Sequence, residues 1–154
     1  MPSELHEHLC QKGVSWLKRN GFGVAAMNVW ALGSRERVDC IGYRQQCSAM
    51  IEVKDSRSDF LADRKNPERL AGGVGTYRFY LAPTGLIAVN DLPAGWGLLQ
   101  LSGRAIQMVY GPKGNLWPSA ESAVGSEWEA FVHSPCSVAE RSILYTIARQ
   151  AMAN

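Results

Sequence analysis

The sequence predicts a single α/β domain in which helices flank a mixed β-sheet. The chain has 154 residues, of which 46% are hydrophobic and 19% charged, a size and composition typical of one globular domain. Apolar residues recur at helical spacing near both ends of the chain. Between these ends lie short apolar runs bounded by Gly, Asn and Ser, which are typical of strands.

The first half of the chain is predicted to follow the order helix, three strands, helix, strand. Ser3 can cap a helix over residues 3–20, and Gly21 can adopt the left-handed conformation that ends one. Ser56 with Asp59 three residues later has the pattern of a capping box, so a second helix begins there, and Asn66-Pro67 breaks or kinks it. The strands are expected at residues 22–32, 37–43, 48–54 and 76–81.

The second half is predicted to append a hairpin and further helices. Residues 96–101 and 105–110 form two strands around a Ser102-Gly103 turn. After a loop rich in Pro and Gly over residues 111–119, a short helix is expected at 127–132 and an amphipathic helix at 137–152. We therefore treat residues 1–154 as one domain.

Composition excludes several classes of protein. No run of 18 apolar residues exists, so no membrane span is expected, and the N-terminus lacks the apolar stretch of a secretory signal, so we expect a cytoplasmic protein. No CxxC motif or clustered histidines are seen, so we expect reduced thiols and no zinc site. The net charge is only +2, but residues 1–78 carry twelve of the sixteen basic side chains. This distribution is a weak indication of a phosphate-bearing partner, and the alternative is a solvated basic face.

One predicted strand contains a carboxylate and an ammonium. In SAMIEVK (residues 48–54), alternation puts Glu52 and Lys54 on one face and Ile51 and Val53 on the other. If this strand and the preceding one turn tightly at Gln45-Gln46, Asp39 lies opposite Glu52 with Cβ atoms about 5 Å apart. Gln-Gln is not a favoured turn pair, so a looser loop is the alternative.

Two carboxylates at that separation repel each other. At about 5 Å and an effective dielectric constant of about 20, the cost is roughly 3 kcal/mol, of which Lys54 offsets only part. A divalent cation held by Asp39 and Glu52 would turn this repulsion into ligation, and oxygen ligands suit Mg²⁺ or Mn²⁺. The neighbouring Lys54 could then orient an attacking water and stabilise charge that develops on phosphorus.

The pattern Asp39 … Glu52-Val53-Lys54 resembles that of the PD-(D/E)XK nuclease superfamily, with the spacing of its Holliday-junction-resolvase-type and VRR-NUC-type members. The longer segment IEVKDSRSDFLADRK (51–65) is similar to one in the MmcB-like DNA-repair family. GLIAVNDLPAGWGLL (85–99) and ERSILYTIARQAM (140–152) also resemble the later part of that family. The resemblance covers most of residues 14–152 and is strongest over 37–65.

The resemblance implies a restriction-endonuclease-like core with the order αβββαβ and a metal-dependent DNA endonuclease of repair or recombination, acting on branched or single-stranded DNA. Asp39 and Glu52 would bind Mg²⁺ or Mn²⁺ together with the backbone carbonyl of Val53, and Lys54 would assist catalysis. Because junction-cutting relatives are commonly paired, it also suggests a homodimer.

The chain departs from the superfamily pattern in its first strand. Superfamily members frequently supply another acidic residue from the first helix or first strand, but here the strand reads AAMNVW, with Asn28 and no carboxylate. Glu7 in the first helix is the better substitute and Glu4 the weaker one. If neither reaches the metal, a second ion is not expected and turnover would be slow.

Four basic residues are candidates for contacts with DNA phosphates. Lys65 is favoured because it follows the apolar turn closest to the site, and Arg37 alternates onto the face of Asp39. Arg57 and Arg64 complete the set, and the alternative for the helix cations is a solvated face paired with acidic neighbours, including Asp63. Asp59 is expected to cap the helix, and the tryptophans at 30, 96, 117 and 128 are expected to pack rather than stack on bases.

Two other functions stay open. The missing first-strand carboxylate is compatible with a repair accessory protein that binds DNA without cleaving it. Alternatively, Glu52 and Lys54 form a structural ion pair at a sheet edge, and the function lies elsewhere.

Overall fold

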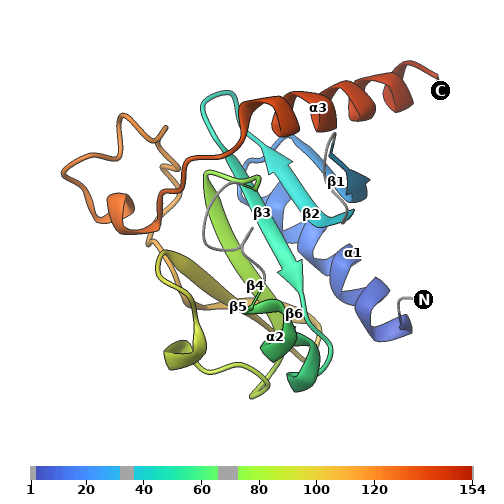
Figure 1. Ribbon diagram of the computed structural model, residues 1–154, viewed down its shortest axis with the longest axis vertical. Helices are drawn as coiled ribbons and strands as arrows, with labels where there is room; N and C mark the ends of the chain where they lie inside the picture. Colours follow the sequence, from blue (N-terminus) through green and yellow to red (C-terminus); the bar gives the residue numbers. More distant parts are fainter. Residues whose placement is uncertain (1–2, 32–36, 66–72, 154) are drawn as a thin grey trace.

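The computed structural model describes residues 3–31, 37–65 and 73–153. Within them, six strands form one mixed sheet in the order β1-β2-β3-β4-β5-β6, flanked by helices (Figure 1). The elements in chain order are α1 (Glu4–Arg19), β1 (Val24–Trp30), β2 (Arg37–Tyr43), β3 (Ser48–Val53), α2 (Arg57–Asp63), β4 (Tyr77–Pro83), the 3₁₀ helix η2 (Val89–Asp91), β5 (Trp96–Ser102), β6 (Ala105–Tyr110), the 3₁₀ helix η3 (Glu127–Phe131) and α3 (Ser137–Met152).

This confirms the predicted α/β class and the order of the elements. The main differences lie at their ends: β1 is shorter than predicted, β4 runs two residues further, and the segment near residue 127 is a 3₁₀ helix. Strand β3 ends at Val53, so Lys54 lies just beyond it. The predicted helix stop at Asn66-Pro67 lies outside the described residues, and α2 itself ends at Asp63.

Helix α1 begins and ends where its capping residues require. The Ser3 hydroxyl accepts the His6 backbone N–H at 3.0 Å, and Gly21 follows the helix with a left-handed φ of +84°. At Gly13, an added Cβ would lie 2.9 Å from Cys40 Sγ. The absence of a side chain at Gly13 therefore lets α1 approach β2 closely.

The topology of the sheet places β3 in its interior. Strands β1, β2 and β3 form an antiparallel meander, and β4 then pairs parallel with β3 after the chain passes through α2. Strand β5 is parallel to β4 and forms an antiparallel hairpin with β6. Because β3 has neighbours on both sides, any ion pair that it carries is not at a sheet edge.

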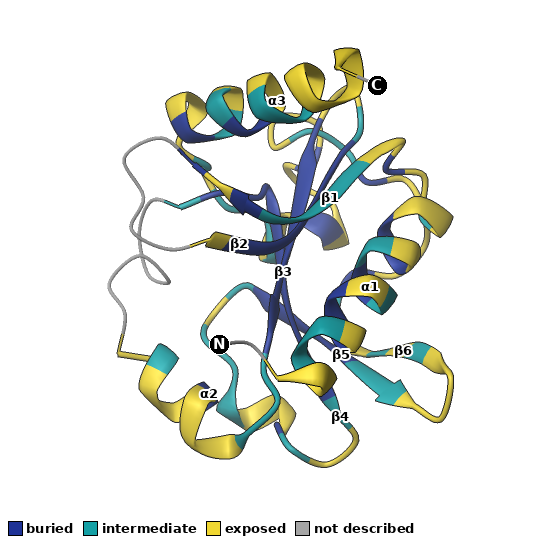
Figure 2. Cartoon of the chain, turned by 90° about the vertical axis from the view of Figure 1, so that its right-hand side faces the viewer, coloured by how far each residue is buried: buried dark blue, intermediate teal, exposed yellow. Residues whose placement is uncertain are grey.

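Each face of the sheet has its own apolar cluster. Figure 2 shows α1 beside the sheet, α3 above it and α2 below. Ile51 and Val53 belong to the cluster under α1, whereas Met50 belongs to the cluster that includes Phe60 of α2 and Ile143 of α3. Alternation therefore puts Glu52 on the α2 side of the sheet, away from Ile51 and Val53 as predicted.

Three of the four tryptophans singled out from the sequence pack in the core. Trp117 is fully buried and makes edge contacts with Trp16, Phe22 and Trp128. Trp96 is buried as well, but Trp30 is 54% exposed, so the packing expectation was wrong for Trp30. None of the helices in the described ranges has both the length and the apolar character needed to cross a bilayer.

Candidate active site

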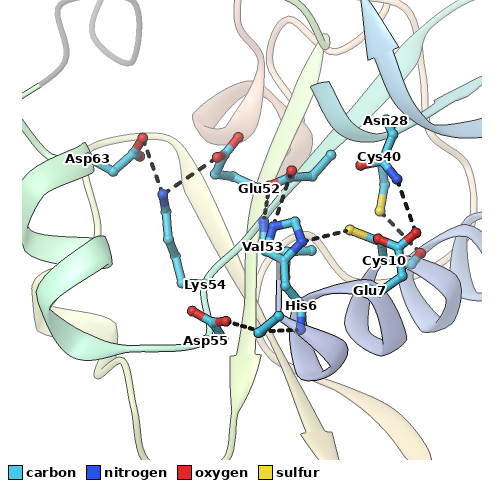
Figure 3. A network of polar contacts seen from close by, with 12 residues as sticks. His6, Glu7, Cys10, Asn28, Cys40, Glu52, Val53, Lys54, Asp55 and Asp63 are labelled. Carbon is cyan, nitrogen blue, oxygen red and sulfur yellow. Dashed lines mark hydrogen bonds and ion pairs between the residues drawn. The ribbon is translucent and has the colours of Figure 1, made fainter. Parts of the chain in front are cut away.

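A cleft of about 480 Å³ opens at the carboxyl end of β3, next to α2 and the start of α1. Figure 3 shows the polar contacts around it. Such positions outside the carboxyl ends of strands are frequent ligand sites in α/β proteins. The lining residues are His6, Asp39, Glu52, Val53, Lys54, Asp59, Ala62, Asp63 and Lys65.

The hairpin between β2 and β3 has the predicted register. Arg44 N–H donates to the Cys47 carbonyl at 2.9 Å across a two-residue turn, and the ladder ends with Cys40 opposite Ile51. The next pair in this register is Asp39 and Glu52. Both are nearly buried, at 8% and 9% exposed, and both line the cleft, so the two carboxylates share one face.

A backbone group fixes the Asp39 carboxylate. Its Oδ2 accepts the N–H of Val53 at 2.9 Å. This bond ties the start of β2 to the end of β3, and it leaves Oδ1 facing His6. The side chain is therefore held in place by the strand pairing itself.

Lys54 is held between two carboxylates. Its Nζ lies 3.5 Å from Glu52 Oε1 and 3.4 Å from Asp63 Oδ1. The Tyr80 hydroxyl donates to Asp63 Oδ2 at 2.6 Å, and Tyr80 lies beside Glu52 in the parallel pairing of β3 with β4. The Lys54 ammonium is thus positioned from both sides at the cleft wall.

The alternative considered for the α2 cations placed Asp63 on a solvated helix face, paired with them. The structure instead turns it inward to Lys54. Neither Asp63 nor Tyr80 was predicted as a site residue. The only sequence signal for Asp63 is its place one turn after Asp59 on the helix that follows the strand, which is weak.

His6 reaches the site from the first turns of α1. Its Nε2 lies 3.4 Å from Asp39 Oδ1, and its Nδ1 lies 3.7 Å from the sulfur of Cys10, four residues later on the same helix. No pattern in the sequence groups His6 with the carboxylates, because His6 and His8 point to different faces of a helix and His133 is far along the chain. The i, i+4 spacing of His6 and Cys10 is the one local signal of this group.

Glu7, the predicted substitute for the missing acidic residue, has a different partner. Its Oε1 accepts the side-chain N–H of Asn28 at 3.5 Å, and Glu7 is not among the residues that line the cleft. Asn28 has a left-handed φ of +56° within β1, a conformation that Asn tolerates better than most residues. Glu4 is exposed.

The four residues predicted to contact DNA have different surroundings in the structure. Lys65 lines the cleft. Arg57 forms a bidentate pair with Asp91, at 2.6 Å and 3.0 Å, and the hydrogen bond from Arg57 lowers the pKa of Asp91 to about 2. Arg64 lies over the ring of Phe60, 5.9 Å from its centroid, and Arg37 is exposed at the start of β2.

Asp59 has two roles. Its backbone N–H donates to the Ser56 hydroxyl at 3.2 Å, which forms the predicted helix cap. Its side chain lines the cleft. The predicted Ser56 cap is confirmed with Asp59 as its backbone donor, whereas the Asp59 carboxylate contributes negative charge to the cleft.

The cysteines are free thiols, as expected. Cys10, Cys40 and Cys47 are buried as small apolar residues, whereas Cys136 is exposed. Hydrogen bonding with Cys10 and burial raise the pKa of the Cys40 thiol well above its ordinary value. Cys40 is therefore a neutral thiol packed behind Asp39.

No protein-family model and no curated protein matches the chain. Among solved structures, the chain is similar to a protein of unknown function from Silicibacter pomeroyi, with a TM-score of 0.63 and 24% sequence identity. The match covers 99% of this chain and 92% of that protein. At this identity the likeness shows a shared fold, and the function must be argued from the site.

Proposed function

We propose that the protein is a metal-dependent DNA endonuclease with a restriction-endonuclease-like core, acting on branched or single-stranded DNA in repair or recombination. The observation that carries the proposal is that Asp39, Glu52, Val53 and Lys54 line one cleft at the carboxyl end of β3. The order α1-β1-β2-β3-α2-β4 also agrees with the αβββαβ order that the resemblance implies.

The donor set of the cleft fits a divalent cation. The lining contains four carboxylates and two ammonium groups, so it carries a charge of −2 with His6 neutral. Asp39, Glu52 and the carbonyl of Val53 offer the oxygen ligands that Mg²⁺ and Mn²⁺ accept. Such an ion, when bound, polarises a phosphoryl oxygen and lowers the pKa of a water molecule.

The protein's own groups would position the reaction. Hydrolysis adds a water oxygen to phosphorus and breaks one P–O bond, and the leaving oxygen takes up a proton. Lys54, held between Glu52 and Asp63, can orient the water and stabilise negative charge on the phosphoryl oxygens. Lys65 at the cleft can bind a flanking phosphate, which aligns the strand without reading its sequence.

The experiment is a cleavage assay on linear, single-stranded, flapped and four-way-junction DNA with Mg²⁺ or Mn²⁺. We expect the wild type to cut at least one branched or single-stranded substrate. Lys54→Ala should abolish cleavage and leave DNA binding largely intact, whereas Lys18→Ala, an exposed lysine of α1, should cut like the wild type. A Lys54→Ala protein that cuts at the wild-type rate would contradict the catalytic role.

A second candidate function is DNA binding without cleavage in a repair complex. It is favoured by the first strand, where Asn28 stands in place of a carboxylate and bonds to Glu7. In the same assay, this function predicts that the protein binds branched DNA tightly and cuts none of the substrates with either Mg²⁺ or Mn²⁺. That result would select it over the endonuclease.

A further inference from the structure

The imidazole of His6 lies where a ligand of the proposed metal would lie. Its Nε2 is 3.4 Å from Asp39 Oδ1, and both residues line the cleft with Glu52 and Val53. This separation is longer than the 2.7–3.2 Å of an ordinary N–H···O hydrogen bond. Two ligands that each lie about 2.0–2.2 Å from one ion, at about 90–110°, are about 2.8–3.6 Å apart, so the pair fits a shared ion.

The two candidate ligand atoms, Asp39 Oδ1 and His6 Nε2, belong to side chains whose other polar atom already has a partner. Asp39 Oδ2 accepts the Val53 N–H, which leaves Oδ1. His6 Nδ1 contacts the sulfur of Cys10 at 3.7 Å, which leaves Nε2. Histidines that bind metals usually have their second ring nitrogen hydrogen-bonded in this way, because the bond fixes the tautomer and the ring orientation.

The start of α1 also holds His6 in place. The backbone N–H of His6 is bound by the Ser3 hydroxyl, and Ser3 in turn donates to the Asp55 carboxylate next to Lys54. These contacts connect the first turn of α1 to the segment that follows β3. His6 is therefore attached to the same part of the sheet as the carboxylates, and Glu7 is directed to Asn28 instead.

We propose that His6 is the third side-chain ligand of the metal and that its imidazole makes the site bind Mn²⁺ in preference to Mg²⁺. The inference deepens the proposed function and rests on it. Mg²⁺ prefers oxygen ligands and keeps several waters, whereas imidazole is a ligand for transition ions. Because His6 takes the place of an expected carboxylate, the preference of this otherwise oxygen-lined site shifts from Mg²⁺ toward Mn²⁺.

Cys10 supports His6 in this arrangement and is not itself a ligand. The ligand atoms of His6, Cys10 and Asp39 lie within 4.8 Å of one another, which also suggests a thiolate site. However, Cys10 is fully buried, does not line the cleft, and contacts Nδ1, the ring nitrogen that does not face Asp39. One ion at Nε2 and Oδ1 is therefore screened from the sulfur by the imidazole ring.

Metal binding can be tested without any cleavage assay. Mn²⁺ and Mg²⁺ titrations of the full chain by calorimetry, with Mn²⁺ also followed by electron paramagnetic resonance, should give at least ten-fold tighter binding of Mn²⁺. His6→Ala should weaken Mn²⁺ binding at least ten-fold and change Mg²⁺ binding little. His8→Ala, an exposed histidine on the same helix, is the matched control, and His6→Asp should shift the preference toward Mg²⁺.

Pulsed electron paramagnetic resonance of the Mn²⁺-loaded wild type should show coupling to an imidazole nitrogen, which changes when the histidines carry ¹⁵N. This readout needs no variant, so it holds even if His6→Ala folds poorly. Absence of nitrogen coupling, with Mn²⁺ binding that depends on Asp39 and Glu52, would overturn the role of His6 and leave the endonuclease proposal standing. Binding that is unchanged in Asp39→Asn and Glu52→Gln would overturn both.

Discussion

Asp63 Oδ1 lies 3.4 Å from the Nζ of Lys54, although Asp63 belongs to α2 and Lys54 follows β3. The opposite oxygen of Asp63 accepts a short hydrogen bond from the Tyr80 hydroxyl of β4. The segment after β3, helix α2 and strand β4 are therefore linked through Lys54, Asp63 and Tyr80. In the proposed reaction Lys54 must hold a water or a phosphoryl oxygen, so Asp63 and Tyr80 act as positioning residues.

The first prediction concerns Asp63→Asn. The amide keeps an acceptor for Tyr80 but loses the charge that holds Lys54, so we expect the cleavage rate to fall about 10- to 100-fold, the range typical of supporting partners. DNA affinity and metal affinity should stay within about two-fold. Any residual single-turnover cleavage by Lys54→Ala should not fall further when Asp63→Asn is added.

Single-turnover cleavage rates for the four proteins of this cycle would test the prediction. Asp59→Asn is the matched control, since Asp59 is on the same helix and lines the same cleft. Additive losses in the double variant would mean that Asp63 acts independently of Lys54. Tyr80→Phe should reproduce a milder form of the Asp63→Asn defect.

The second prediction separates Lys65 from Arg57. Lys65 lines the cleft, whereas the guanidinium of Arg57 is already engaged by Asp91 and the Leu86 carbonyl. We expect Lys65→Ala to weaken DNA binding and to reduce the slope of log K against log salt by about 1, the change for one lost phosphate contact.

Arg57→Ala should leave that salt slope unchanged and lower the thermal unfolding midpoint instead, as should Asp91→Ala. Binding isotherms between about 50 and 200 mM salt would show the difference. If Arg57→Ala reduces the slope as much as Lys65→Ala does, the pair with Asp91 opens on DNA, and the sequence-based assignment of Arg57 is the correct one.

The third prediction is a pH dependence of stability caused by His133. Burial lowers the pKa of this imidazole below its ordinary value, and Nε2 bonds to the Gly95 carbonyl at 2.9 Å. The unfolded chain binds the proton more readily than the folded protein does. The contribution of neutral His133 to the free energy of unfolding is therefore complete above the unfolded pKa of about 6.5 and is lost as the pH falls below it. His133→Gln keeps a donor for Gly95 and removes the titration.

Urea unfolding at pH 7.5, 6.5 and 5.5 would measure this effect. The free energy of unfolding should drop more steeply toward acid in the wild type than in His133→Gln. Equal slopes in the two proteins would assign the acid sensitivity to other groups. Replacing the exposed His8 by Gln gives the control for loss of a solvated histidine.

Sequence patterns were sufficient for the contacts between neighbouring strands. A two-residue turn between β2 and β3 fixes which residues face each other, and alternation then fixes which side they occupy. The predicted register of the hairpin, with Cys40 opposite Ile51, is confirmed for this reason. The same local logic located the Ser3 and Ser56 caps, since a capping hydroxyl acts within three residues of itself.

Contacts between distant elements could not be predicted in this way. His6 and Glu7 are adjacent on α1 and differ by about 100° around the helix axis, so the choice of which meets Asp39 depends on how α1 packs on the sheet. Helix rotation is set by the fit of the Leu9 and Trp16 side chains into the core, which periodicity alone does not specify. For the same reason the parallel pairing that brings Tyr80 to Glu52 was not foreseen.

The last prediction concerns the stability of the metal-free protein. Asp39 and Glu52 are nearly buried on the same face, and Lys54 contacts only Glu52 of the two. Asp39→Asn should therefore relieve repulsion while the amide oxygen still accepts the Val53 N–H. We expect the free energy of unfolding without metal to rise by about 1 kcal/mol, as at other sites where activity is maintained at a cost in stability.

Addition of Mn²⁺ should raise the unfolding midpoint of the wild type and have little effect on Asp39→Asn, because a ligand stabilises only the protein that binds it. Glu121→Gln removes an exposed charge outside the cleft and should behave like the wild type in both measurements. Destabilisation of metal-free Asp39→Asn by a similar amount would instead identify Asp39 as a structural residue of the hairpin.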